Sequence, residues 1–102
     1  MLARMARLDD KQIATALGRL PGWTREGEGI RRQFTFASFP DAIAFVTRLA
    51  FGAEAADHHP DILINYKRVT LTYSTHSEGG ITPKDVDGAR AADGVASAMG
   101  RT

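Results

Sequence analysis

The three histidines of the sequence lie near acidic residues, at places where helices or strands are expected to end. His58 and His59 are adjacent, and Glu54 precedes them by about one helical turn. His76 lies further along the chain, and Asp85 follows it by nine residues. Imidazole exchanges protons near neutral pH, so it is well suited to general acid–base catalysis. This set of residues therefore indicates acid–base chemistry.

Two other interpretations of these residues stay open at this point. A histidine near a helix end is often a capping or surface residue, and Asp85 or Glu54 could be a helix cap or a solvated charge. A zinc site is the second alternative, because histidine and carboxylate can both bind zinc. An adjacent His-His pair rarely directs both rings at one ion, however, and no HExxH spacing is present. We therefore expect no metal.

The composition of the 102-residue chain indicates one globular domain over residues 1–102, with residues 1–8 as a loose N-terminal extension. Hydrophobic residues make up 43% and charged residues 25%, which argues against disorder. The formal net charge of +1 gives no electrostatic basis for binding nucleic acid or an anionic membrane. The lack of cysteine excludes disulfides and thiolate catalysis and fits a cytoplasmic location. No signal peptide or membrane-spanning segment is recognisable.

Three helices are expected, because three capping patterns each precede a stretch of helical period. The capping pairs are Asp9 with Gln12, Ser38 with Asp41, and Thr82 with Asp85. Pro21-Gly22 ends the first helix, and the second must end before Pro60. Pro83 occupies the first position of the third helix, where a missing N–H is tolerated.

Two β-hairpins are expected between these helices. The alternation of apolar and polar residues and the positions of turn-forming residues predict both. In the first hairpin, residues 23–25 and 30–36 are the strands and residues 27–29 are the turn. In the second, residues 62–66 and 69–75 are the strands and Lys67-Arg68 is the turn. Arg32 lies on the apolar face of its strand and weakens the alternation. Because hairpins make antiparallel strands, the expected class is α+β, with a four-stranded antiparallel sheet, three helices packed on one face, and the order α-β-β-α-β-β-α.

The second helix has more apolar surface than one contact with a sheet needs. Its two adjacent apolar faces are Ala42, Phe45, Leu49 and Ala53, and Phe39, Ile43, Val46 and Ala50. Some of this surface is therefore expected to meet another subunit. We expect a symmetric homo-oligomer, with the helix face or a sheet edge at the interface.

The loops that carry the histidines suggest how a ligand could be held. Pro60 holds His59 extended, so the rings of His58 and His59 should point in different directions. One ring could then hold a ligand while the other exchanges a proton, and Glu54 could orient one of them. The loop after His76 contains Gly79-Gly80, whose backbone a flat ligand could approach because it lacks side chains.

The spacing of these residues resembles the signature of the pterin-4a-carbinolamine dehydratase family. Residues 54–60 read Glu-Ala-Ala-Asp-His-His-Pro, Tyr66 and Ser74-Thr75-His76 follow, and Asp85 completes the pattern. The resemblance covers nearly the whole chain, from residue 21 to residue 99, and the combined spacing is highly specific. It implies the same helix–hairpin–helix–hairpin–helix order as the periodicity.

The resemblance implies an enzyme, a dehydratase that removes water from 4a-hydroxytetrahydrobiopterin to give quinonoid dihydropterin. It implies catalytic roles for His58, His59 and His76. Supporting or substrate-binding roles are implied for Glu54, Asp57, Pro60, Ser74, Thr75 and Asp85. We assign acid–base roles to His58 and His76, and the binding of the pterin edge to His59. This chemistry needs no metal and no other cofactor.

The resemblance also implies a biological setting and partners. The pterin would be regenerated after an aromatic amino-acid hydroxylase turns over, by a homodimer or homotetramer without direct contact to nucleic acid or membrane. The rival interpretation is a protein-binding role through the second helix, since family members act as dimerisation partners of a homeodomain transcription factor.

One departure from the family pattern is visible. The family often has tryptophan where this sequence has Ile62, so we do not expect aromatic stacking on a pterin from that position.

Overall fold

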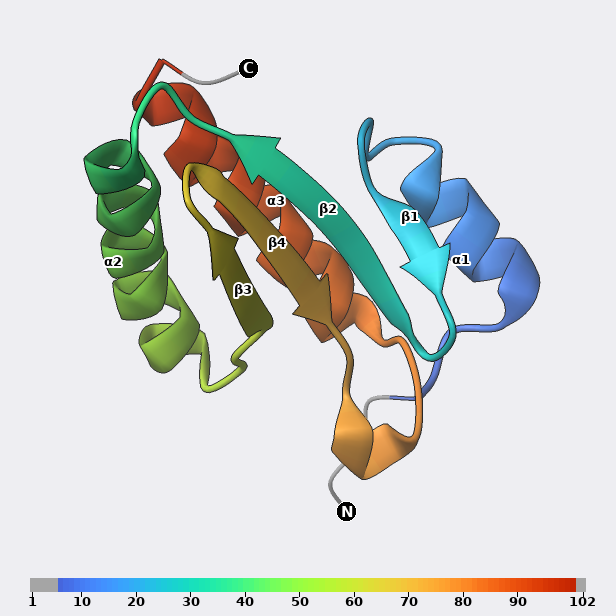
Figure 1. Ribbon diagram of the computed structural model, residues 1–102. Coiled ribbons are helices and arrows are strands. Elements are labelled where there is room, and N and C mark those ends of the chain that lie inside the picture. The colour runs from blue at the N-terminus through green and yellow to red at the C-terminus, as the bar shows by residue number, and fades with distance from the viewer. Residues whose placement is uncertain (1–5, 101–102) are drawn as a thin grey trace.

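One antiparallel sheet, with strand order β1-β2-β4-β3, carries the fold. The structure is a computed structural model and describes residues 6–100. In chain order the elements are α1 (Asp10–Leu17), β1 (Thr24–Glu26), β2 (Gly29–Thr35), α2 (Phe39–Ala56), β3 (Asp61–Asn65), β4 (Arg68–Tyr73), the 3₁₀ helix η1 (His76–Glu78) and α3 (Pro83–Ala98). The predicted α+β class and the order α-β-β-α-β-β-α are confirmed (Figure 1).

The sheet is buried on one face and solvated on the other. Successive side chains of a strand point to opposite faces, so alternate residues of β2 and β4 face the core. On that face Ile30, Phe34, Val69, Leu71 and Tyr73 are buried, whereas on the other face Arg31, Gln33 and Thr35 are exposed. Thr70 also lies on the second face but is buried, and its hydroxyl accepts from the Gln33 amide at 3.4 Å. Figure 1 shows α3 crossing behind β4 and β2, with α1 beside β1. The helices therefore cover the apolar face.

The helix starts follow the capping patterns of the sequence. At α1 the Asp9 carboxylate accepts from the Gln12 N–H at 2.8 Å, and the Gln12 amide oxygen accepts from the Asp9 N–H at 2.9 Å. At α2 the Ser38 hydroxyl accepts from the Asp41 N–H at 3.2 Å. The predicted end of the first helix at Pro21-Gly22 is wrong, because α1 ends at Leu17. Gly18 follows, a poor helix former, and the chain continues in tighter turns.

The second hairpin turns one residue earlier than predicted. Asn65 pairs with Arg68, so the two turn residues are Tyr66 and Lys67 rather than Lys67-Arg68. Tyr66 has a φ of 54°, in the left-handed region. The alternation of side chains along β4 cannot reveal this, because it fixes the face of each residue and not the point at which pairing ends. Strand β4 also ends at Tyr73, two residues before the predicted limit.

Helix α2 keeps one apolar face exposed. The predicted inner face, Ala42, Phe45, Leu49 and Ala53, is buried. On the other face Phe39 is 47% exposed and Ile43 is 38% exposed. None of the helices in residues 6–100 combines the length and the hydropathy needed to cross a membrane.

Arg32 reaches the apolar side of the sheet because α3 supplies a partner for its charge. Its Nη1 lies 2.8 Å from Oδ1 of Asp93. The Trp23 indole N–H donates to the same carboxylate, at 3.0 and 3.1 Å from its two oxygens. The guanidinium also lies over the Phe34 ring, 4.5 Å from its centroid. The exception to the strand pattern is therefore a partly buried polar junction between β2 and α3.

Asp93→Ala tests this junction. The change leaves the Trp23 N–H and the Arg32 guanidinium partly buried without their acceptor, so the free energy of unfolding should fall by about 1–3 kcal/mol. Asp87→Ala is the matched control, because Asp87 is an exposed α3 residue whose ion pair with Arg90 measures 3.7 Å. It should change stability by less than about 0.5 kcal/mol in urea unfolding. Equal losses in both variants would contradict a structural role for Asp93.

Candidate active site

The end of α2 directs the two adjacent histidines away from the helix. Asp57 caps α2 with a φ of 52° and a ψ of 41°, in the left-handed region that short polar residues tolerate. The N–H of His58 bonds to the carbonyl of Ala53 at 3.1 Å, which completes the last turn. The side chain of Asp57 is exposed, so this residue acts in the structure through its backbone.

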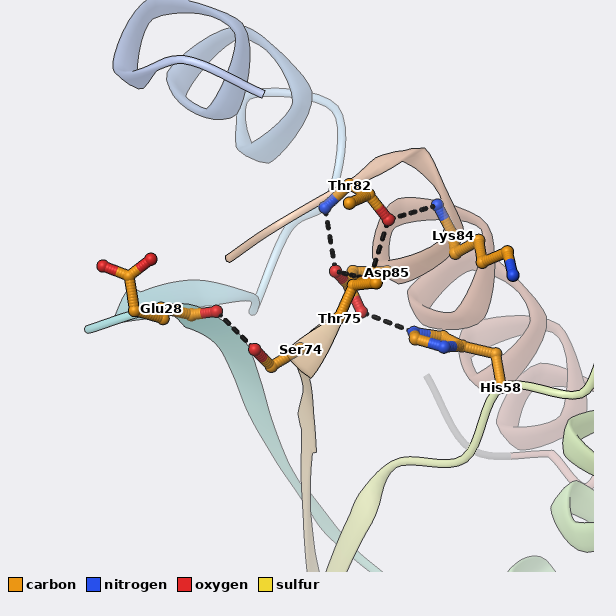
Figure 2. A network of polar contacts seen from close by, with 7 residues as sticks. All are labelled: Glu28, His58, Ser74, Thr75, Thr82, Lys84 and Asp85. Atoms are coloured by element: carbon orange, nitrogen blue, oxygen red, sulfur yellow. Dashed lines mark hydrogen bonds and ion pairs between the residues drawn. The ribbon is translucent and has the colours of Figure 1, made fainter. Parts of the chain in front are cut away.

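His58 points inward to a buried carboxylate at the start of α3. Its Nε2 lies 2.6 Å from Oδ1 of Asp85 (Figure 2). Asp85 is fully buried, and the side chain of His58 is 13% exposed. The Tyr73 ring lies next to that of His58, with an angle of 23° between the ring planes and 6.0 Å between centroids. His58 is therefore largely enclosed, which the sequence did not suggest.

Two threonines hold the other oxygen of Asp85. Oδ2 accepts from the Thr75 hydroxyl at 2.8 Å and from the Thr82 N–H at 2.9 Å. Since the Thr75 hydroxyl has one proton, the 2.8 Å contact between the two hydroxyls must be donated by Thr82. The Thr82 hydroxyl in turn accepts from the Lys84 N–H at 3.2 Å, as Figure 2 shows. Both oxygens of the Asp85 carboxylate and both threonine hydroxyls therefore have hydrogen-bond partners.

These contacts decide which nitrogen of His58 is available for chemistry. The predicted capping box is confirmed, but it uses only Oδ2 of Asp85, so the residue both caps α3 and binds His58. As a carboxylate, Asp85 can only accept, and Nε2 must therefore carry the proton. Within residues 6–100, Nδ1 has no hydrogen-bond partner. A neutral His58 would thus offer Nδ1 as a base, and a protonated one would offer it as an acid.

His59 forms a second, exposed pair. Its Nε2 lies 2.8 Å from Oε1 of Glu54, with side chains 56% and 82% exposed, respectively. The predictions that the two adjacent rings point in different directions and that Glu54 orients one of them are confirmed. His59 also lines a groove of about 360 Å³ with Pro60 and Ile62. It lies at the surface, whereas His58 is enclosed.

His76 begins η1 directly after the threonine that binds Asp85. It is exposed, and it lines none of the cavities that His58 and His59 line. The Ser74 hydroxyl donates to the carbonyl of Glu28 at 2.6 Å, which ties the end of β4 to the β1–β2 turn. His76 therefore lies next to the Asp85 network through the backbone of Thr75, and no side-chain contact joins it to His58.

The loop after His76 is less open than predicted. Gly80 is buried, and a Cβ there would lie 2.7 Å from Cδ of Arg7 and 2.8 Å from Oε2 of Glu28. The expected ligand approach is therefore wrong at Gly80, because two side chains occupy that space. The Leu8 N–H bonds to the carbonyl of Ile81 at 2.8 Å, so Arg7 and Leu8, assigned to a loose extension, contact this loop. Residues 1–5 of that extension lie outside the described part.

The structure brings His58, Asp85 and Thr75 into direct contact and leaves His59 with Glu54 as a separate pair. Tyr66, part of the sequence signature, lies at the opposite end of the β3–β4 hairpin. Thr82 was missed as a site residue, although its capping position was recognised. Among residues 6–100, no three histidine or acidic side chains gather as metal ligands would. The arrangement can orient one imidazole for proton transfer.

Known proteins are similar in sequence to this chain over most of its length. The family model described as pterin 4 alpha carbinolamine dehydratase matches residues 6–95. A protein of Roseiflexus sp. (strain RS-1) is 57% identical over 81 residues, 79% of this chain and 87% of that protein. A protein of Nocardia farcinica (strain IFM 10152) is 56% identical over 89 residues, 87% of this chain and 94% of that protein. Both are named "Putative pterin-4-alpha-carbinolamine dehydratase".

Solved structures share its fold. The crystal structure of a transcriptional coactivator/pterin dehydratase from Brucella melitensis has a TM-score of 0.86 and 39% identity, covering 88% of this chain and 98% of that chain. A pterin dehydratase-like protein, described as a RuBisCO assembly factor in the alpha-carboxysome, has a TM-score of 0.60 and 23% identity. The alignment covers 72% of this chain and 86% of that chain. At 23% identity, the similarity shows a shared fold and nothing more.

The pKa of Tyr73 makes the enclosure of the site measurable. Burial raises this pKa from 10.0 to about 12, and the charges of Asp85 and Asp93 add to the shift. The unfolded chain then loses the phenolic proton first, so this contribution to stability is complete below pH 10 and is lost between pH 10 and about 12. The free energy of unfolding should fall by roughly 1–3 kcal/mol over that range.

Urea unfolding of the wild type and of Tyr73→Phe at several alkaline pH values checks this. Tyr73→Phe should not show the part of the fall in unfolding free energy at alkaline pH that comes from the Tyr73 phenol. In Tyr66→Phe, where Tyr73 is the remaining tyrosine, phenolate absorbance should rise only near pH 12 or on unfolding. A folded-state midpoint near pH 10 would contradict the enclosure of Tyr73.

Proposed function

Because the chain belongs to the pterin-4a-carbinolamine dehydratase family, we propose that it removes water from 4a-hydroxytetrahydrobiopterin to give quinonoid dihydropterin. The observation that carries the proposal is the 2.6 Å contact between His58 and the fully buried Asp85. A base held by a third group is a recurrent arrangement in enzymes that move protons. This reaction would contribute to regenerating the pterin after an aromatic amino-acid hydroxylase has turned over.

The reaction consists of two proton transfers around one bond cleavage. The 4a-hydroxyl gains a proton and leaves as water, and N5–H gives up its proton as the C4a–N5 double bond forms. One imidazole acts as acid and another as base, and we assign these roles to His58, through Nδ1, and to His76. Both transfers fall within the ordinary range of histidine chemistry near neutral pH, without a metal or other cofactor.

The remaining residues would bind and position the pterin. His59, exposed and oriented by Glu54, is suited to hydrogen-bonding the polar edge of the ring system. Asp57 and Pro60 set the direction in which the two adjacent histidines leave α2. Ser74 would act by fixing the end of β4, through its bond to the carbonyl of Glu28.

Substitution of the acid–base residues tests the proposal in a dehydration assay. His58→Ala and His76→Ala should each lower the rate by about 10²-fold or more. Asp85→Asn should lower it by about 10²- to 10⁴-fold, because the amide NH₂ would face Nε2 and reverse the tautomer of His58. The donors Thr75 and Thr82 would hold the amide oxygen at the place of Oδ2.

Two controls accompany this assay. Asp87→Asn makes the same chemical change at an exposed position of α3 and should keep the wild-type rate. Dialysis against EDTA should also change nothing, since no ligated metal takes part. Wild-type activity in the His58→Ala, His76→Ala double variant would contradict the assignment of His58 and His76 as the acid–base residues. Loss of activity on dialysis that added zinc restores would replace it with a metal mechanism.

We also propose that the chain forms a homodimer or homotetramer. Two uncovered surfaces support this. One is the outer face of α2, where Phe39 and Ile43 are exposed, and the other is the edge strand β3, where Leu63 is 55% exposed. Unpaired strand edges and large exposed apolar side chains are typical of subunit interfaces.

The face of α2 also supports a second candidate function, the binding of another protein. One relative of known structure is described as a transcriptional coactivator/pterin dehydratase.

Charge substitutions distinguish the two surfaces. Phe39→Asp or Val46→Asp should dissociate the assembly if α2 is the contact, and Leu63→Asp should do so if β3 is. Arg48→Asp is the control. At about 100° per residue, nine positions place Arg48 on the side of α2 opposite Phe39. Light scattering at micromolar concentration measures the mass. A strictly monomeric wild type would contradict the proposed assembly.

A further inference from the structure

Tyr73 carries a buried hydroxyl that has no hydrogen-bond partner in the described part of the chain. The residue is 2% exposed. Its ring packs against those of Trp23 and His58, with 6.0 Å between centroids in both cases, but within residues 6–100 its oxygen forms no hydrogen bond. A buried polar group without a partner destabilises the folded state, and such groups are rare in native proteins. The fold alone therefore gives no reason for this hydroxyl.

The hydroxyl end of Tyr73 lies beside a cleft between α2 and α3. The cleft has a volume of about 400 Å³, and Tyr73, His58 and Gly88 are among its lining residues. A Cβ on Gly88 would lie 2.9 Å from Cζ of Tyr73, the carbon that bears the hydroxyl, and 2.5 Å from Cε1. A side chain at position 88 would thus collide with the ring. Glycine at this position lets the phenol pack directly against the wall of the cleft.

The same cleft leads to the nitrogen of His58 that the proposed reaction uses. Nε2 of His58 is bound to Asp85, which does not line the cleft. Nδ1 is therefore the nitrogen of this ring that a molecule in the cleft can reach. The planes of the His58 and Tyr73 rings form an angle of 23°. With 6.0 Å between the two centroids, a bicyclic substrate is large enough to contact both side chains at once.

Tyr73 keeps its proton over the pH range in which imidazoles titrate. Burial raises the pKa of its phenol to about 12, and the charges of Asp85 and Asp93 add to the shift. The phenol is thus neither the acid nor the base of a reaction near neutral pH, and it offers an O–H donor throughout. The partner that this O–H lacks is a hydrogen-bond acceptor.

We propose that Tyr73 is a substrate-binding residue that donates a hydrogen bond to the 4-carbonyl oxygen of the pterin, a role that rests on the proposed function. Near the reacting carbon, the 4a-hydroxyl and N5–H exchange protons with the imidazoles. The 4-carbonyl is attached directly to C4a and only accepts hydrogen bonds, so it matches a donor that does not titrate. Substrate binding would then supply the partner that the buried hydroxyl lacks in the free protein.

Tyr73→Phe tests this role in the dehydration assay, because it removes the hydroxyl and keeps the ring. KM should rise about five- to ten-fold, with kcat within about two-fold of the wild type, since the carbonyl accepts in the bound substrate and in the transition state alike. Urea unfolding at pH 7 should show a stability at least equal to that of the wild type. A fall in stability together with the loss of activity would indicate a structural role and contradict the proposal.

Tyr66→Phe is the matched control. It makes the same chemical change at the second of the two tyrosines, which is 68% exposed and lies at the opposite end of the β3–β4 hairpin. This variant should keep the wild-type KM. Equal KM values for the wild type and Tyr73→Phe, in an enzyme that is active, would overturn the role of Tyr73 and leave the proposed function in place.

A binding measurement gives a result even if the wild type shows no dehydratase activity. The full chain is titrated, with NMR detection, with 7,8-dihydrobiopterin and with its analogue that has hydrogen in place of the 4-oxygen. The wild type should bind the carbonyl compound more tightly, and the ratio of the two Kd values should be about five-fold smaller in Tyr73→Phe. Tyr66→Phe should keep the wild-type ratio. The same ratio in Tyr73→Phe, or no saturable binding of either compound, would contradict the proposed hydrogen bond.

Discussion

The buried carboxylate of Asp85 is the constraint on which the rest of the site depends. A fully buried charge is stable only if hydrogen bonds replace the water it has lost. Asp85 receives them from the His58 ring, the Thr75 hydroxyl and the Thr82 N–H, at 2.6, 2.8 and 2.9 Å. Removing a partner from a buried charge typically costs about 3–5 kcal/mol, so all three donors are needed. The segments that supply them must therefore meet at the start of α3.

This requirement links the fold to the proposed chemistry. Two donors, from the segment after β4 and the cap of α3, lie 10 and 3 residues from Asp85, whereas the third, at the end of α2, lies 27 residues away. All three are adjacent in space (Figure 2). The left-handed conformation of Asp57 ends α2 where His58 can reach the carboxylate. Because Asp85 is also the capping residue of α3, one side chain serves stability and the orientation of the imidazole. His59, outside this network, is free to contact a ligand from the surface.

Local interactions were predictable from the sequence, and long-range ones were not. The capping pairs and the contact of His59 with Glu54 lie within about one helical turn, so residue spacing indicates them. Arg32 looked out of place because its partner, Asp93, is 61 residues away. Likewise, nothing local shows that side chains from two distant segments cover Gly80. The meeting of His58 with its carboxylate also spans 27 residues, and only the family resemblance associated the two.

The tautomer of His58 tests the central claim most directly, and ¹⁵N NMR of the imidazole ring reports it. If the buried carboxylate orients this ring, neutral His58 will be protonated at Nε2 and unprotonated at Nδ1 in the wild type. In Asp85→Asn the two nitrogens should exchange these states, because the amide would donate where the carboxylate accepted. A wild-type ring protonated at Nδ1, or the same tautomer in both proteins, would contradict the account.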